Sequence, residues 1–205
     1  AELLPNKPRE RLRASEGAWP LYQIGPGIFT VNVVPPYSGW LDFRKTLAEG
    51  LKLLIESYPS AEQYMKVTHL ELRYIDAFTS RHGYDNFAKY VSTHFNLQSP
   101  VGDEFIGDFA TEGSHEFLCE AQFRAKKPAN AFSVVKLAPG TSNNERAAVL
   151  QILTRYDEDG RTPEANFILK WFDEAHESTN AWFEAVMKPA LREAIGPMTE
   201  EEVSK

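Results

Sequence analysis

Residues 22–43 read YQIGPGIFTVNVVPPYSGWLDF, and this stretch decides how the fold begins. The segments 21–24 and 28–34 have the composition of β-strands. Gly25-Pro26-Gly27 between them must bend or bulge the chain, because proline lacks a ladder donor and glycine accepts a positive φ. The two segments therefore form either a hairpin or one kinked strand, which Pro35 and Pro36 end.

A helix is predicted next, over residues 40–57. Apolar residues recur at steps of three and four, which places them on one helix face, and Pro59 ends the pattern. The helix is therefore expected to cover a sheet on one side only. Its apolar positions are Trp40, Phe43, Leu47, Leu51, Leu54, Ile55 and Tyr58.

The middle of the chain predicts mainly antiparallel strands. Residues 66–78 alternate with period two, and a short helix with Asp85 as its cap is expected over 84–95. Four further strands, separated by segments rich in turn formers, are predicted over 105–110, 116–125, 131–137 and 147–157. Two of the separators are Pro139 to Asn144 and the last turn, Asp157 to Gly160.

A long aromatic helix follows Thr162-Pro163, which is a good helix start. Pro189 should kink or restart this helix, and Gly196-Pro197 should end it. The order of elements predicts an α+β fold, in which a curved, mainly antiparallel sheet packs against the long C-terminal helix (helix-grip or related), with an additional helix after the first strand. The expected organisation is a flexible N-terminal arm over 1–18, a single domain over 19–197 and a polar C-terminal tail over 198–205.

Composition narrows the classes of partner. The formal net charge is −7 and the sequence pI is about 5.3, which argues against nucleic acid binding, because that needs clustered Lys and Arg. A single cysteine, Cys119, cannot form an internal disulfide, and no run of about 20 apolar residues is present to span a membrane. We therefore expect a soluble, cytoplasmic protein that does not associate with membranes.

The first candidate site lies on the strand predicted over 66–78. His69, Glu71 and Arg73 alternate along it, so their side chains share one face and can converge on a polar cavity, where His69 and Glu71 would serve as an acid and base pair. The alternative is a solvent-facing surface on which they pair across strands with residues such as Glu120, Gln122 or Arg124, and exposed strand faces favour this alternative.

The second candidate site lies on the long C-terminal helix. Asp173 and His176 are three residues apart and share a face, a geometry suited to two metal ligands or to one oriented imidazole. The spacing is not HExxH, and no further His or Cys lies at a suggestive distance, so neither a metal nor another cofactor is predicted. The simpler interpretation is a histidine at the margin of the buried stripe.

Four short motifs resemble one protein family. They are YQIGPGIFTVN, then Tyr37-Ser38-Gly39-Trp40 with Phe43, then Leu72-Arg73-Tyr74-Ile75 followed by Asp76, and Phe172-Asp173-Glu174-Ala175-His176 with Phe183. The chain is similar in these motifs to a sporadically distributed prokaryotic family of conserved proteins of unassigned function. Asp76 stands where the family pattern has Asn. The resemblance implies an additional N-terminal strand in longer members and supplies no reaction, but it adds Trp40 to the candidate ligand-binding residues.

Three functions are compatible with these patterns. The first is a non-enzymatic module that binds a protein partner or a second copy of itself through strand edges or the aromatic helix. The second is a small-molecule pocket between the sheet and the C-terminal helix, with His69, Glu71, Arg73 and His176 as polar contacts. The third, an enzyme that uses the same groups, is the least favoured, because no known catalytic motif is present.

Overall fold

The computed structural model describes residues 7–34, 36, 38–101, 107, 111 and 114–196. Close contacts divide the chain into two compact units. Unit 1 comprises Ala1–Lys66, Thr162–Leu169 and Met198–Lys205, and unit 2 comprises Val67–Arg161 and Lys170–Pro197. The single domain expected over 19–197 stays a prediction, and each unit is described by itself. The strand predicted over 105–110 falls almost wholly outside the described residues.

Unit 1 contains a small antiparallel sheet. Its strands β1 (Glu10–Leu12), β2 (Leu21–Gly25) and β3 (Ile28–Asn32) lie in the order β1-β2-β3. Gly25 pairs with Ile28 across the Pro26-Gly27 turn, and Gly27 has φ of 69°, so the structure contains the hairpin rather than the kinked strand. β1 lies inside the segment 1–18, where the sequence predicted only an arm, because its pairing with β2 is a contact between distant residues.

Helix α1 (Trp40–Ser57) has the predicted bounds and packs against this hairpin. The close approach occurs at Gly50, where an added Cβ would lie 2.5 Å from a ring carbon of Tyr22. The Tyr22 hydroxyl donates a hydrogen bond to the Thr46 carbonyl at 3.2 Å, and the Tyr22 ring stacks on Phe29. Gly50 is therefore required in the middle of α1 because the Tyr22 ring occupies the space that a side chain would need. A short helix, α2 (Ala61–Tyr64), follows.

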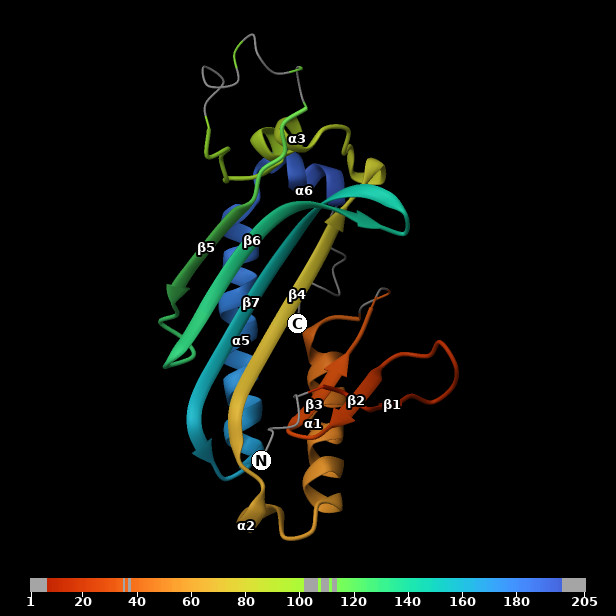
Figure 1. Cartoon of the computed structure of the whole chain (residues 1–205), viewed down its shortest axis with the longest axis vertical. Coiled ribbons are helices and arrows are strands. Elements are labelled where there is room, and N and C mark those ends of the chain that lie inside the picture. Colours follow the sequence, from red (N-terminus) through yellow and green to blue (C-terminus); the bar gives the residue numbers. More distant parts are fainter. Residues whose placement is uncertain are drawn as a thin grey trace. The chain divides into compact units, whose positions relative to one another are not determined.

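Unit 2 is built on a four-stranded antiparallel sheet. Its strands are β4 (Val67–Phe78), β5 (Cys119–Arg124), β6 (Ala131–Ser142) and β7 (Glu145–Arg161), in the spatial order β4-β7-β6-β5. The strands are long and curved, and the part of helix α5 (Ala165–Val186) that belongs to unit 2, from Lys170 on, runs along one face of the sheet (Figure 1). The predicted α+β class, with an antiparallel sheet against the C-terminal helix, is confirmed.

Two predicted turns are wrong, because strand pairing continues through them. β6 and β7 stay paired from Pro139 opposite Ala148 to Ser142 opposite Glu145, and only Asn143 and Asn144, both at positive φ, form the turn. Pairing between β5 and β6 reaches only as far as Cys119 opposite Leu137. Pro139 lies beyond this point, where β6 has no partner on the β5 side within the described sheet, so its missing N–H donor is tolerated. Asp157 to Gly160 also belong to β7, where the register with β4 shifts instead of turning.

Aromatic and hydroxyl groups hold α5 on the inner face of the sheet. The Trp171 ring lies 6.3 Å from that of Tyr156, and the Trp182 ring lies 4.4 Å from that of Phe123. Between them, Thr154 Oγ1 is 3.1 Å from Ser133 Oγ and 3.4 Å from Thr179 Oγ1. All three hydroxyls are buried, so they fix the position of the helix over β6 and β7 without leaving the buried groups unpaired.

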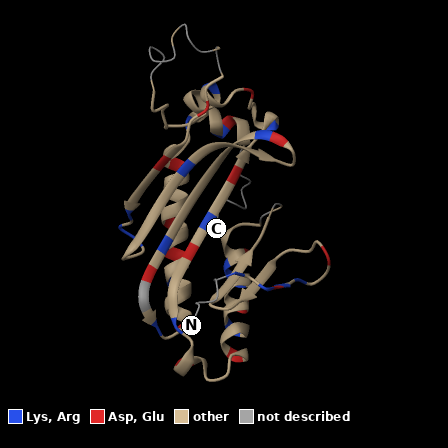
Figure 2. Cartoon of the chain, in the orientation of Figure 1, with Lys and Arg blue, Asp and Glu red and all other residues tan. Residues whose placement is uncertain are grey.

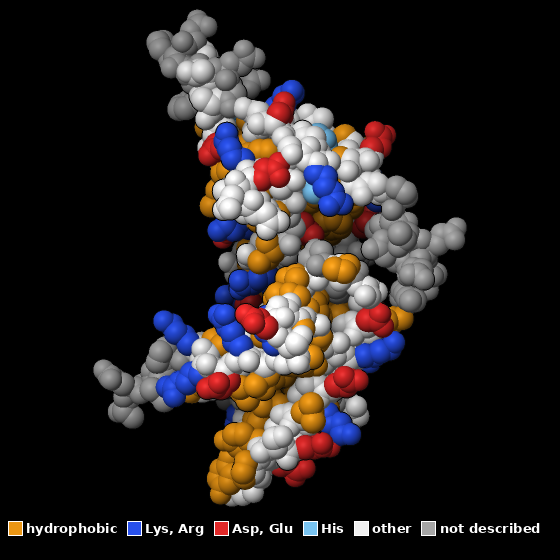
Figure 3. Space-filling model, turned by 90° about the vertical axis from the view of Figure 1, so that its right-hand side faces the viewer, with side chains coloured by type: hydrophobic (Ala, Val, Ile, Leu, Met, Phe, Trp, Pro, Cys, Tyr) orange, Lys and Arg blue, Asp and Glu red, His pale blue; other side chains and the backbone are white. Residues whose placement is uncertain are grey.

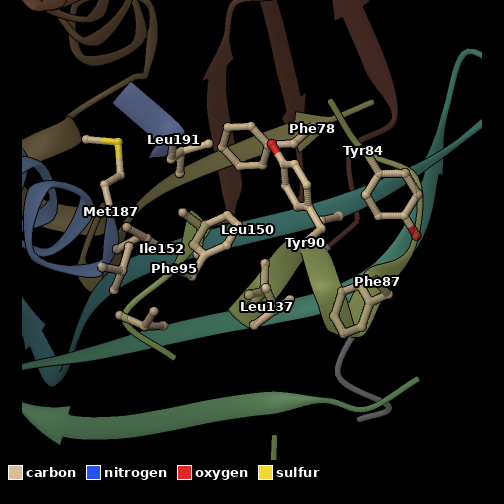
Figure 4. Packing of buried hydrophobic residues seen from close by; sticks show 14 residues of the cluster. Phe78, Tyr84, Phe87, Tyr90, Phe95, Leu137, Leu150, Ile152, Met187 and Leu191 are labelled. Carbon is tan, nitrogen blue, oxygen red and sulfur yellow. The ribbon is translucent and has the colours of Figure 1, made fainter. Parts of the chain in front are cut away.

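Two shorter helices close one end of unit 2. Helix α3 (Phe87–His94) is capped by Asn86, whose side chain accepts from the Lys89 N–H at 3.1 Å; Asp85 was the wrong prediction for this role. Pro189 restarts the chain as α6 (Pro189–Ile195). Aromatic and aliphatic side chains from α3, α6 and the sheet interlock in a core here (Figure 4). Its largest fully buried members include Tyr90, Phe87, Phe95, Leu137, Leu150, Ile152 and Leu191.

Within the described ranges, no helix combines the length and the hydrophobicity that a membrane crossing requires.

We expect Gly50→Ala to destabilise unit 1, although alanine favours helices. The new methyl group would overlap the Tyr22 ring, and overpacking of this kind typically costs about 1–3 kcal/mol. Urea unfolding followed by circular dichroism measures the change in the free energy of unfolding. Glu49→Ala, at the neighbouring exposed position of α1, is the control and should change stability little. A Gly50→Ala variant as stable as the wild type would contradict the packing.

Candidate functional site

The first sequence-predicted group forms a charged cluster on the outer face of the sheet, away from α5. His69 Nδ1 lies 2.5 Å from Asp157 Oδ1 on β7, and His69 Nε2 lies 3.5 Å from Glu71 Oε2. The Arg73 guanidinium donates to Glu71 Oε1 at 2.7 Å. Acidic and basic residues are interspersed along β4 as a result (Figure 2). The structure therefore brings His69, Glu71 and Arg73 together as predicted.

The partner strand of this cluster is not the predicted one. Glu120, Gln122 and Arg124 lie on β5, which β7 and β6 separate from β4. The cross-strand neighbours of His69 and Glu71 are instead Asp157 and Arg155 of β7. The alternation within β4 can be read from the sequence, whereas Asp157 was missed because strand order depends on contacts between distant segments.

Electrostatics favour charged forms in this cluster. Hydrogen bonding to Glu71 raises the pKa of His69, partial burial opposes this, and Asp157 adds to the rise. Hydrogen bonding to His69 in turn lowers the pKa of Glu71. The imidazole and the guanidinium are both paired with carboxylates, and all of these side chains are partly exposed. The arrangement is that of a surface ion-pair network.

The second predicted group lies on the opposite side of β4. The Tyr74 hydroxyl is 2.9 Å from His176 Nδ1 on α5, and their rings are 6.1 Å apart. Burial lowers the pKa of His176, while the charge of Asp173, one helical turn earlier, partly opposes this. A neutral imidazole can accept the Tyr74 O–H at Nδ1. His176 is therefore a histidine at the margin of the buried helix face, held by Tyr74, which agrees with the simpler of the two interpretations of the sequence.

The two groups do not share a site. Arg73 and Tyr74 are adjacent in a regular strand, so their side chains project from opposite faces, and Arg73 and His176 are separated by the sheet itself. A single pocket with His69, Glu71, Arg73 and His176 as joint contacts is therefore not formed. Among the described residues, no group of three or more His, Cys, Asp or Glu side chains is arranged to hold a metal ion.

Asp76 is a polar group that the sequence did not place in a site. It lies between Tyr74 and Phe78 on the inner face of β4, opposite Leu150 of β7. Its carboxyl forms no hydrogen bond or ion pair with another described residue, and burial raises its pKa to about 6. The sequence did contain a signal for this site, because Asp76 continues the two-residue alternation of the inward-facing residues Leu72 and Tyr74.

Trp40, the remaining candidate, belongs to unit 1. It begins α1, and its ring lies 5.8 Å from that of Phe43. Phe43, with Trp19, Gly39 and Asp42, helps to line a shallow hollow of about 180 Å³, of which Trp40 is not a lining residue. Trp40 is thus a packing residue beside this hollow.

Unit 1 also carries exposed apolar residues. The sequence pattern places Tyr58 in the buried helix stripe and does not single out Leu53 or Tyr64. Leu53 in the last turns of α1, Tyr58 at its C-cap and Tyr64 at the end of α2 are 60%, 45% and 65% exposed. An open hollow of about 470 Å³, lined by Ile55, Ser60, Ala61, Glu62 and Gln63, lies at the same place. Figure 3 shows hydrophobic side chains gathered at this lower end of the molecule. We call Leu53, Tyr58 and Tyr64 the α1–α2 surface.

Comparisons with models of protein families, with curated proteins and with solved structures find no match to the chain. Membership of the sporadically distributed prokaryotic family therefore stays a prediction.

We expect Asp76→Asn to raise the free energy of unfolding above about pH 6. The unfolded chain loses the Asp76 proton near pH 3.8 and the folded chain near 6, so ionisation of the buried carboxyl reduces stability as the pH rises through this window. The rise in pKa corresponds to at most about 3 kcal/mol. Urea unfolding from about pH 4 to about pH 8 measures the effect.

Asp42→Asn, on the exposed first turn of α1, is the matched control and should leave this pH dependence unchanged. A variant of Asp76 whose stability follows the wild type at every pH would refute the burial of a lone carboxyl.

Asp157→Asn is expected to lower the pKa of His69, because it removes one of the two carboxylates that favour the imidazolium. An NMR titration of the imidazole measures the change, and Glu120→Gln, on β5, serves as the control. Because the pKa of His69 is raised in the folded state, its protonation stabilises the fold fully at pH values below 6.5, the ordinary pKa of histidine. This stabilisation is lost as the pH rises through the folded-state pKa. Solvent exposure limits this contribution to less than about 1 kcal/mol. An unchanged His69 titration would show that the contact is not maintained.

Proposed function

We propose that the protein is a non-catalytic module that binds a partner protein through the α1–α2 surface. The observation that carries this proposal is the exposure of Leu53, Tyr58 and Tyr64 on α1, its C-cap and α2, next in sequence to the residues that line an open hollow. Large apolar side chains gathered on a surface are typical of interaction sites, and tyrosine is enriched in the residues that dominate binding energy.

The titratable side chains support a binding role over a catalytic one. His69 lies between the carboxylates of Glu71 and Asp157, which raise its pKa, and His176 is held by Tyr74. Burial raises the pKa of the Cys119 thiol, which donates to the Gln98 carbonyl, so a reactive thiolate is disfavoured. None of these groups has the exposed, activated character of a nucleophile or general base.

The test measures a defined complex. The purified chain captures proteins from cell extract, and the captured protein is purified and titrated against Leu53→Glu and Tyr64→Glu. A charge at either position should weaken binding by tenfold or more, because truncation of an interface hot spot costs about 2 kcal/mol. Leu41→Glu, an exposed leucine in the first turn of the same helix, is the matched control.

Two outcomes would contradict this function. One is the absence of any protein that the wild type binds more tightly than the two α1–α2 variants. The other is equal affinity of Leu53→Glu, Tyr64→Glu and Leu41→Glu for the captured protein.

A small-molecule site between the sheet and α5 is the second candidate. Its support is the grouping of Tyr74, His176 and the lone Asp76 carboxyl on the inner face of β4 and the facing helix, since perturbed titratable groups gather at binding sites. Native mass spectrometry of freshly purified protein tests this role. A retained small molecule that Asp76→Asn loses would support it, and an unliganded mass for both proteins would count against it.

A further inference from the structure

The sheet of unit 2 ends in two strands of different character. β4 and β5 are the outer strands in the order β4-β7-β6-β5, and each pairs on one side only within the described sheet. β5 is six residues long, whereas β4 is twelve. An edge strand presents a row of backbone N–H and C=O groups that can pair with another strand.

The two edges differ in the features that normally protect an edge strand. β5 is short, and Lys126, Lys127 and Pro128 follow it after Ala125. β4 contains no lysine, proline or glycine from Val67 to Phe78, and its exposed residues include the β-branched Ile75, at 60%. The register shift between Val67 and His69 and the inward-pointing Asp76 protect the two ends of β4. The regular stretch between them, from His69 to Ile75, is suited to receive a strand.

We propose that β4 pairs in antiparallel fashion with β4 of a second copy of this chain, about a two-fold axis at Leu72. This register places Glu71 opposite Arg73 of the second copy, and Arg73 opposite Glu71 of the second copy. Two reciprocal ion pairs then form on the outer face, where directly opposite residues have Cβ atoms about 5 Å apart. The two sheets join into one.

Charge selects this register over its neighbours. An axis at Glu71 or at Arg73 would place two like charges directly opposite each other, which is destabilising. An axis at Leu70 pairs His69 with Glu71 but leaves Arg73 opposite Val67. Centring on Leu72 alone satisfies both Glu71 and Arg73 in each copy.

The ion pairs within one chain do not have to break. Glu71 uses Oε1 for Arg73 and Oε2 for His69 of its own chain, and each carboxylate oxygen can accept more than one hydrogen bond. Arg73 uses Nη2 for Glu71 and has four further N–H donors. Dimerisation therefore extends the existing network across the two-fold axis.

Two single variants test the register. Glu71→Arg leaves only positive charge at positions 71 and 73, and Arg73→Glu leaves only negative charge. Each variant alone should lose the dimer that the wild type forms at low ionic strength, in sedimentation velocity or native mass spectrometry across a concentration series. An equimolar mixture should form a heterodimer, because every opposite pair is then of unlike charge.

The mixture separates dimerisation from effects within one chain. Each variant still lacks its own Glu71–Arg73 pair in the mixture, so a heterodimer can arise only from ion pairs between the two chains. A wild-type monomer throughout the concentration series, a dimer that survives either substitution, or a mixture without heterodimer would each overturn the proposal. Hydrogen exchange gives a second readout, because β4 amides should become slower with rising wild-type concentration. Leu53→Glu and Tyr64→Glu should leave the dimer intact, which distinguishes this interface from the α1–α2 surface.

Discussion

The four-stranded sheet of unit 2 must bury one face against α5, and this requirement assigns each strand residue to one of two environments. Side chains alternate across a strand, so Leu70, Leu72 and Tyr74 meet the helix while His69 and Arg73 face away from it. A shift of one residue would place charges in the core and leucines on the surface. The register of the sheet, the ion-pair network and the Tyr74–His176 contact all depend on this one condition.

Polar groups that enter the buried layer divide into satisfied and unsatisfied ones. Ser133, Thr154 and Thr179 bond to one another, and Thr179 also donates to the Ala175 carbonyl, so these hydroxyls add specificity to the contact between helix and sheet. Asp76, on the same face, has no such partner among the described residues. Because burial disfavours the ionised carboxyl, Asp76 makes the stability of this layer depend on pH.

The two proposed interaction surfaces use different physics. The α1–α2 surface offers apolar area, whose removal from water drives association and depends little on salt. The β4 edge offers backbone hydrogen bonds with a charge pattern that selects one register, and its contribution weakens as salt screens the ion pairs. At the other side of the same sheet, β5 is short and is followed by lysines in the turn, features that disfavour pairing with another strand.

The sequence by itself determined the elements whose signal is local. The apolar repeat set α1 at Trp40–Ser57, and alternation placed His69, Glu71 and Arg73 on one face, because these periods depend only on near neighbours. Tertiary structure alone decided that Asp157 rather than Glu120 meets His69, that Pro139 continues a strand, and that Gly50 makes room for Tyr22. These outcomes depend on which distant segments come together, and that choice is made by burial over the whole sheet rather than by local spacing.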